Sequence, residues 1–346
     1  MHSNFSPADK FNGKKVSTFR LVNKKGTEAI ISNYGALILS FKIKKEDGSM
    51  NDVVLGFNTP EDYLNETYLK TYPMFGAAVG RYGNRIKNGK MIIDDVQYQL
   101  PLNIGTDHLH GGITGFDKKV WDIDLFDKEK NVLQLSFTST DGEEGYPGNL
   151  KVSIRFELNN NNELSHEYFA TTDKATAVNL THHSYFNLNN GKGRVDNHFI
   201  KINASSILEQ DENLTTNGNL IKVKGTRFDF NEPRKMAEQW GDEEGYDQSF
   251  VVNKKEKDLA WVAEAWSDES KTKLEVATTE PVVHFYTGIW IPTIKGKDNT
   301  QYAPYSGFCF ETQVHPNAIN IPSFPNTILR PGEMYKHKTI YRLSNL

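Results

Sequence analysis

The chain has 346 residues, of which 37% are hydrophobic and 24% are charged, and its formal net charge at pH 7 is −4. The basic residues are scattered, so the charge pattern excludes an extended electrostatic surface for nucleic acid or for an anionic membrane. No stretch approaches the roughly 18 consecutive apolar residues that a membrane-spanning helix needs. The composition therefore favours a neutral small molecule as the partner.

The single cysteine, Cys309, excludes a disulfide within the chain and fits a reducing compartment, and its apolar surroundings predict a buried structural thiol. Residues 1–14 are polar and lack the apolar core of a signal peptide, so we interpret them as an N-terminal extension. We therefore expect a cytoplasmic protein, or a periplasmic one if a leader has been removed. The moderate charge permits a monomer or a homodimer.

Alternating apolar and polar residues dominate the chain and predict β-strands. Short helices are expected only at Pro60 and from Pro233 onward, where proline occupies a first helical turn. A hairpin is expected at 151–171, because the alternation is interrupted there by a turn of consecutive asparagines. In chain order, the other expected strands are 28–43, 91–100, 131–140, 199–203, 259–266, 273–279, 283–290 and 337–343.

Neither helix is long enough to organise a domain, and the chain contains no Pro- or Ser-rich linker and no repeat of fixed period. Many strands with few helices are typical of an all-β protein. The sequence therefore predicts that residues 1–346 form one large antiparallel β-sandwich with a few short helices.

The first candidate functional segment, residues 80–86, has the sequence GRYGNRI. Arg85 can donate a planar fork of hydrogen bonds to neighbouring hydroxyls, and Asn84 can both donate and accept. A tight turn with surface arginines would explain the same residues. The segment lacks the Gly-Lys-Ser/Thr ending of a phosphate-binding loop.

Histidines provide the next two candidates. His108 and His110 are two residues apart, so on a strand they would lie on the same face, whereas the adjacent His182 and His183 would lie on opposite faces. Such rings can transfer protons or bind metals, although a hydrogen-bonded structural role is the common alternative.

Carboxylates complete the set. Asp247 can accept hydrogen bonds from two neighbouring sugar hydroxyls, or it can cap a turn. Glu311 directly follows a strongly apolar run, and a carboxylate at the end of a buried strand is costly to ionise unless it is paired or used. Local context therefore makes Glu311 the preferred candidate for a general base.

In their order along the chain, these segments resemble the aldose 1-epimerases, also called galactose mutarotases, from about Ile30 to the C-terminus. The resemblance implies a large β-sandwich of the galactose mutarotase-like type and catalysis without an organic cofactor or a metal. The matching segments are 80–86 (GRYGNRI), 109–112 (LHGG), 183–188 (HSYFNL), 246–247 (YD), 285–288 (FYTG) and 311–313 (ETQ).

The resemblance also implies the roles of individual residues in converting the α and β anomers of a free hexose. Glu311 would be the general base, His183 the general acid, and His110 would stabilise developing charge. The sugar would be held by Asn84, Arg85, His110 and Asp247. His284 stands where the family commonly has Gln, and we count it as a further binding residue; two other departures are His182 for Asn and Asn317 for Asp.

Four side chains are candidates for an apolar surface against the sugar, although each could belong to the core instead: Tyr185, Phe186, Phe285 and Trp290.

Four other functions stay open at this point. The histidines could form a metal-dependent isomerase, and Asp247 with Glu311 could form the carboxylate pair of a glycosidase. A sugar-phosphate epimerase would need another cation near the pocket, for which Arg81 is the candidate. The same fold could also be a sugar-binding module without turnover, which would need neither an acid nor a base.

Overall fold

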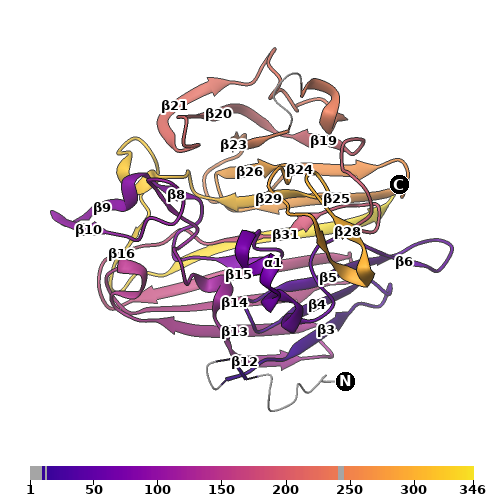
Figure 1. Ribbon diagram of the computed structural model, residues 1–346, viewed down its shortest axis with the longest axis horizontal. Coiled ribbons are helices and arrows are strands. Elements are labelled where there is room, and N and C mark those ends of the chain that lie inside the picture. Colours follow the sequence, from indigo (N-terminus) through magenta and orange to yellow (C-terminus); the bar gives the residue numbers. More distant parts are fainter. Residues whose placement is uncertain (1–9, 12–13, 241–244) are drawn as a thin grey trace.

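The computed structural model describes residues 10–11, 14–240 and 245–346, which form three main antiparallel sheets (Figure 1). The all-β prediction is confirmed. Most of the predicted N-terminal extension, residues 1–9 and 12–13, lies outside the described residues, and the rest forms the short strands β1 (Lys10–Phe11) and β2 (Lys14–Lys15). No helix among the described residues is long and apolar enough to cross a membrane.

The largest sheet has nine strands, and the C-terminal strand lies in its centre, between two strands from the middle of the chain. Its order is β12 (Asp122–Asp127), β13 (Val132–Ser139), β14 (Leu150–Leu158), β15 (Glu163–Thr172), β31 (Tyr335–Asn345), β25 (Thr272–Thr278), β24 (Ala260–Ser267), β19 (Phe199–Ile202) and β22 (Arg234–Lys235). The predicted hairpin at 151–171 is confirmed as β14 and β15, in which buried and more exposed residues alternate.

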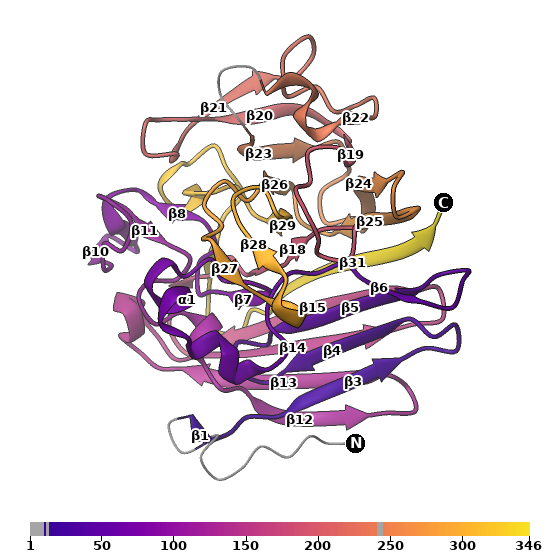
Figure 2. The same cartoon turned by 45° about the vertical axis from the view of Figure 1, so that its right-hand side comes forward.

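The second sheet has six strands and the third has four. The six-stranded order is β18 (Tyr185–Phe186), β29 (Phe308–Gln313), β26 (Val282–Tyr286), β23 (Asp247–Val252), β20 (Ala204–Gln210) and β21 (Thr216–Lys222). The four-stranded order is β3 (Thr18–Val22), β4 (Glu28–Ser32), β5 (Ile38–Lys44) and β6 (Met50–Asp52). In both views, β3–β5 lie against β13–β15 (Figures 1 and 2).

One apolar cluster joins the three sheets. Phe156 of the nine-stranded sheet, Phe285 of the six-stranded sheet and Phe41 of the four-stranded sheet all belong to it and are fully buried. Burying one such ring stabilises the fold by about 1.5–3 kcal/mol. The sheets therefore share a core, and a residue at the end of a strand is held in place by packing from several sheets.

Several predicted elements are divided or shortened. The strand predicted at 28–43 is two strands, β4 and β5, because the chain turns at Gly35 and Ala36, where φ is 59° and 47°. The strand predicted at 91–100 is likewise the hairpin of β9 (Lys90–Ile93) and β10 (Val96–Gln99).

The predicted helices are mostly 3-10 turns. The helix predicted at Pro60 is the 3-10 helix η2 (Pro60–Leu64), followed by the α-helix α1 (Glu66–Thr71), whose first turn is capped by the Asn65 side chain. In place of the helix predicted from Pro233 onward, the chain forms β22 and then the 3-10 helix η6 (Met236–Gln239). The other 3-10 helices in the described part of the chain are η3 (Lys87–Gly89), η4 (Phe116–Lys118), η5 (Glu143–Gly145), η7 (Lys297–Asn299) and η8 (Ala318–Asn320).

The remaining strands among the described residues form two-stranded pairs: β7 (Ala77–Val79) with β17 (Thr181–His183), β8 (Arg85–Ile86) with β11 (His108–Leu109), β16 (Thr176–Ala177) with β30 (Ile328–Leu329), and β27 (Ile294–Lys295) with β28 (Gln301–Tyr302).

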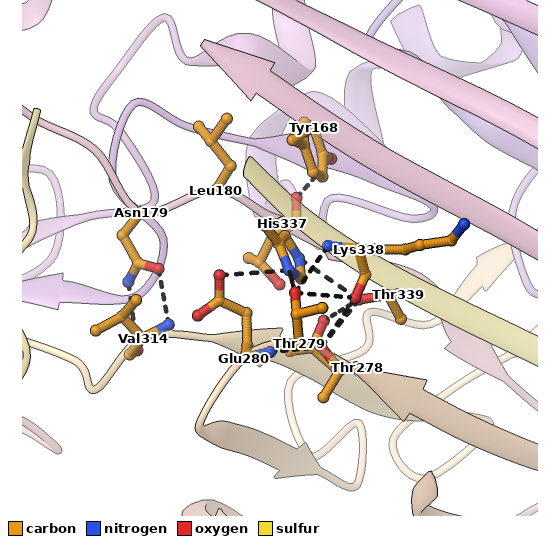
Figure 3. Close-up of polar contacts among 12 residues, drawn as sticks. Tyr168, Asn179, Leu180, Thr278, Thr279, Glu280, Val314, His337, Lys338 and Thr339 are labelled. Carbon is orange, nitrogen blue, oxygen red and sulfur yellow. Dashed lines mark hydrogen bonds and ion pairs between the residues drawn. The ribbon is translucent and has the colours of Figure 1, made fainter. Parts of the chain in front are cut away.

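Buried hydrogen bonds fix the segment that leads into β17 (Figure 3). The Asn179 side chain accepts from the backbone N–H of Val314 at 3.0 Å and donates to its carbonyl at 3.4 Å. The Tyr168 hydroxyl donates to the carbonyl of Thr181 at 2.9 Å, and the Tyr335 hydroxyl accepts from the N–H of Leu180 at 3.1 Å. β17 and the end of β29 are therefore held to a common support.

The same region contains a buried acid beside a buried histidine. Glu280 Oε1 lies 3.3 Å from His337 Nδ1, and the two side chains face each other in Figure 3. Burial raises the pKa of Glu280 to about 7 and lowers the pKa of His337 to about 3. Between about pH 3 and pH 7, Glu280 is therefore protonated and His337 is neutral, so neither side chain carries a charge into the interior.

We expect Glu280→Gln to change the pH dependence of stability. An acid whose pKa is raised by folding contributes stability below its unfolded pKa, near 4.3, and this contribution is lost as pH rises through the folded value of about 7. A shift of this size is worth roughly 3 kcal/mol. The melting temperature of Glu280→Gln should therefore rise relative to that of the wild type between pH 5 and pH 8.

The exposed Glu129→Gln is the matched control and should show no such pH-dependent difference. A constant difference in melting temperature between Glu280→Gln and the wild type at both pH values would contradict the assignment.

Candidate active site

His183 and Glu311 meet where β17 approaches β29. Glu311 Oε1 lies 3.5 Å from His183 Nε2, and the two side chains are only 2% and 7% exposed. The second carboxylate oxygen, Oε2, is buried and accepts no hydrogen bond from any described residue. A buried acceptor without a hydrogen-bond partner lowers the stability of the fold, so such an oxygen in a native structure calls for an explanation. It is available to take a proton from a ligand.

The adjacent histidines of β17 point to opposite sides, as their spacing predicts. His183 faces Glu311, whereas His182 Nε2 donates to the carbonyl of Ala36 at 3.2 Å and its Nδ1 lies 3.1 Å from the Ser184 hydroxyl. Burial lowers the pKa of His182 to about 4, so this ring is neutral. His182 is therefore a structural residue behind the site.

The prediction that His108 and His110 share a strand face is wrong. β11 ends at Leu109, and His110 has a φ of 52°, so the period-two alternation stops before it. The ring of His108 contacts the Tyr146 hydroxyl and the Pro101 carbonyl, both at 2.8 Å, and is structural. The ring of His110 instead lies 5.3 Å from that of His183.

Two features define the state of His110. Its Nδ1 accepts a hydrogen bond from the backbone N–H of Asn84 at 3.2 Å, so the neutral ring carries its proton on Nε2. Burial and the neighbouring His183 hold the pKa of His110 well below its usual value, so the ring stays neutral. The next residue, Gly111, packs so closely that a side chain would not fit there, since a Cβ would lie 1.9 Å from the Gly80 carbonyl oxygen. His110 is therefore a neutral hydrogen-bond donor.

Asp247 lies at the start of β23 and is paired with a histidine of the neighbouring strand. His284 Nε2 lies 2.9 Å from Asp247 Oδ1, and His284 Nδ1 lies 2.9 Å from the Ser249 hydroxyl. Burial alone would raise the pKa of Asp247, but the hydrogen bond from His284 and the charges of His284 and Arg85 outweigh it and hold the pKa below its usual value. Asp247 is therefore an ionised acceptor.

The structure also brings Asn84 and Arg85 to this region. The Asn84 side-chain oxygen accepts from the backbone N–H of Arg85 at 2.8 Å, which fixes the turn. The positive charge of Arg85 lowers the pKa values of Asp247, His284 and His110. The Arg85 guanidinium makes no hydrogen bond with another described side chain, which leaves its donors for a ligand.

Arg81, the candidate phosphate ligand, is occupied elsewhere. It is 2% exposed, and its guanidinium donates five hydrogen bonds, to Ser139 Oγ and to the Ser139, Thr140 and Pro147 carbonyls and Thr176 Oγ1. All its donors are satisfied by the protein. Arg81 is a structural residue, and the phosphate role considered for it is wrong.

The four aromatic candidates have different positions. Phe186 and Phe285 are fully buried in the core, whereas Trp290 is 72% exposed. The Tyr185 ring is stacked on His183, with centroids 5.0 Å apart and an interplanar angle of 27°. Tyr185 therefore helps to fix the His183 ring.

Sequence reasoning missed three side chains in or beside the site. Ser249 contacts His284, Cys309 Sγ lies 3.5 Å from His183 Nδ1, and the amide atoms of Gln313 are buried without a hydrogen-bond partner among the described residues. The signal was the period-two alternation, because Ser249 and Gln313 lie two residues beyond Asp247 and Glu311 on their strands. Cys309 is buried, as predicted.

Potential metal-ligand atoms of His110, His183 and Glu311 all lie within 4.8 Å of one another. A metal would need the lone pair of His110 Nε2, which would move the ring proton to Nδ1, opposite the N–H of Asn84. Two donors would then face each other. The arrangement thus fits proton transfer and hydrogen bonding better than it fits metal binding.

The comparisons with known proteins agree on one family. The model of the aldose 1-epimerase family matches residues 17–342. A galactose mutarotase from Rattus norvegicus is 41% identical over 96% of this chain and 95% of its own length, and an aldose 1-epimerase from Escherichia coli K12 is 34% identical over 98% of each.

Solved structures show the same fold. An aldose epimerase homologue from C. elegans has a TM-score of 0.88 at 30% identity and covers 96% of this chain and 99% of its own. A galactose 1-epimerase from Lactobacillus acidophilus has a TM-score of 0.85 at 29% identity, covering 100% of this chain and 98% of its own. The chain therefore belongs to the aldose 1-epimerase family and is an isomerase of the epimerase class.

Proposed function

We propose that this enzyme interconverts the α and β anomers of free aldohexoses such as galactose and glucose, with Glu311 as the base and His183 as the acid. The observation that carries the proposal is the 3.5 Å approach of the two side chains in a buried site, with one oxygen of Glu311 unpartnered. The names of the galactose mutarotase and aldose 1-epimerase relatives support the choice of substrate.

The reaction needs two proton transfers at oxygens bonded to the same carbon. Glu311 takes the proton of the C1 hydroxyl while His183 delivers a proton to the ring oxygen, so that the bond between C1 and the ring oxygen breaks and an aldehyde forms. Rotation about C1–C2 turns the other carbonyl face toward the C5 hydroxyl. His183 then takes the proton of that hydroxyl as it attacks C1, and Glu311 returns its proton to the carbonyl oxygen. Both residues end in their initial states.

The surrounding groups supply the remaining interactions. His110 is proposed to donate from Nε2 to an oxygen on which negative charge develops, which a neutral ring with a fixed tautomer does without losing its own proton. Asp247 accepts from sugar hydroxyls, and Arg85 with Asn84 donates to others. His284 has no ring nitrogen left for a sugar hydroxyl, because both of its nitrogens already have partners.

A free sugar is a better candidate than a phosphorylated one, because the donors of Arg81 are all used within the protein. We also propose that residues 1–346 act as one domain, since a single core cluster includes side chains from all three main sheets. The single, buried cysteine supports a reducing compartment such as the cytoplasm.

Polarimetry of freshly dissolved α-D-galactose and α-D-glucose at neutral pH tests the function directly. We expect acceleration of mutarotation that is unchanged by a chelator, because the donor set of the site is organised for proton transfer. Loss of the acceleration with EDTA and its recovery with Zn²⁺ would reinstate the metal-dependent alternative. Binding of sugar without acceleration would point to a module that lacks turnover.

Substitution of the two proposed catalytic side chains tests their roles. Glu311→Gln and His183→Asn should each lower kcat by at least about 10²- to 10⁴-fold, the contribution typical of a positioned acid or base, while sugar binding is largely kept. Steady-state polarimetry and calorimetric titration with galactose measure the two effects.

Two buried neighbours serve as matched controls. His182→Asn changes the adjacent histidine and Glu280→Gln changes another buried glutamate, and neither side chain faces the site. Both should keep kcat within about threefold of the wild type. A near wild-type kcat in Glu311→Gln or His183→Asn would remove that residue from the mechanism.

A further inference from the structure

We propose that Ser249 and His284 are positioning residues that hold Asp247 in the orientation that binds sugar, through a hydrogen-bonded chain from Ser249 to His284 to Asp247. The proposal rests on the proposed function of the same site. It gives His284 a different task from direct contact with a sugar hydroxyl, and it gives Ser249 a role that its sequence context alone did not suggest.

Strand pairing places the three side chains together. β23, β26 and β29 are adjacent, and Ser249, His284 and Glu311 are direct partners across these strands. Asp247 lies two residues before Ser249 on β23, so the two side chains project from the same face of the sheet. His284 therefore stands between Asp247 and Ser249 on one side and the proposed base on the other.

The distances leave His284 with no free ring nitrogen. Nε2 lies 2.9 Å from Asp247 Oδ1, and Nδ1 lies 2.9 Å from the Ser249 hydroxyl. The His284 side chain is only 4% exposed, so solvent competes little for these bonds. Asp247 keeps its second oxygen, Oδ2, for a ligand, and the side chain retains 17% exposure through which a sugar can reach it.

The charges around His284 favour its protonated form. Asp247 from β23 and Glu311 from β29 are the carboxylates that face it, and Arg85 and His110 are the basic groups nearby. Burial alone would lower the pKa of His284, but the hydrogen bond and charge of Asp247 and the charge of Glu311 outweigh burial and raise it. Charge-assisted hydrogen bonds are stronger than neutral ones, so the imidazolium holds Asp247 most firmly.

Ionisation of His284 then alters how well Asp247 is held. The imidazolium donates from both nitrogens, to Asp247 and to Ser249, and this fixes the ring. The neutral ring has one N–H only. Because the Asp247 carboxylate can only accept, that proton stays on Nε2 and Nδ1 accepts from the Ser249 hydroxyl, so the bond to Asp247 remains but lacks the positive charge of the imidazolium. Sugar affinity should therefore fall as pH rises through the raised pKa of His284.

The first test separates binding from turnover. Ser249→Ala should raise KM for galactose about threefold to tenfold, the effect of one lost hydrogen bond, and His284→Ala should raise it more, while kcat stays within about threefold in both. His284→Gln retains an amide donor and should recover part of the loss. Unchanged KM in Ser249→Ala and His284→Ala, or a fall in kcat with KM constant, would overturn the proposal.

The second test uses pH. Wild-type KM should rise between pH 6 and pH 9, whereas KM of His284→Gln should be flat over this range because the amide does not titrate. A His284→Gln variant that keeps the wild-type pH dependence of KM would also overturn the proposal. Thermal melting of each variant confirms that it is folded, and a folded Ser249→Ala suffices for the first test if His284→Ala does not fold.

A third measurement separates failure of this proposal from failure of the proposed function. The dissociation constant for galactose, obtained by calorimetric titration, can be measured whether or not the wild type accelerates mutarotation. If the wild type binds galactose without turnover, the proposed function fails, yet the weaker binding expected for Ser249→Ala still decides the role of the chain. If Asp247→Asn and Ser249→Ala both bind galactose as the wild type does, the positioning role is wrong.

Discussion

A buried carboxylate oxygen without a hydrogen-bond partner, Glu311 Oε2, is the constraint on which the site depends. Leaving such an acceptor unsatisfied costs about 1–3 kcal/mol. The surroundings provide the opposing stabilisation, because Glu311 lies on β29 between two paired strands and next to Phe310, a member of the shared core. A strand paired on both sides can hold a buried, unpartnered side-chain oxygen in place, whereas a loop would move until that oxygen found a hydrogen-bond partner.

Three histidines around this carboxylate are each fixed by a contact with a neighbouring residue. Asn84 fixes His110, Tyr185 stacks on His183, and Ser249 bonds to His284. These contacts also assign different proton states, since burial keeps His110 neutral whereas Asp247 favours a charged His284. Histidine rings can therefore serve as a neutral hydrogen-bond donor and as a charged partner of a carboxylate within the same site.

The sequence correctly predicted elements that follow from the local alternation of apolar and polar residues. It missed features that depend on backbone turns or on which strands pair in a sheet. Alternation over 151–171 correctly predicted a hairpin, but the division of 28–43 required positive φ values at Gly35 and Ala36 that the alternation does not reveal. The shared face assumed for His108 and His110 failed for the same reason, because the strand ends at Leu109. The hydrogen bond between Ser249 and His284 joins β23 and β26, which are neighbours in the sheet but not consecutive along the chain. Only the strand order of the sheet reveals it.

Contacts between strands that are distant in the sequence also explain why the segment leading into β17 is held by buried polar side chains. His183 and Glu311 lie on different strands, so their 3.5 Å approach is kept only if β17 and β29 cannot slide past one another. Apolar packing is non-directional and resists such sliding poorly, whereas the paired hydrogen bonds of Asn179 with Val314 fix the register of the backbone itself (Figure 3). The buried polar groups there thus help to keep the distance between the proposed base and the proposed acid.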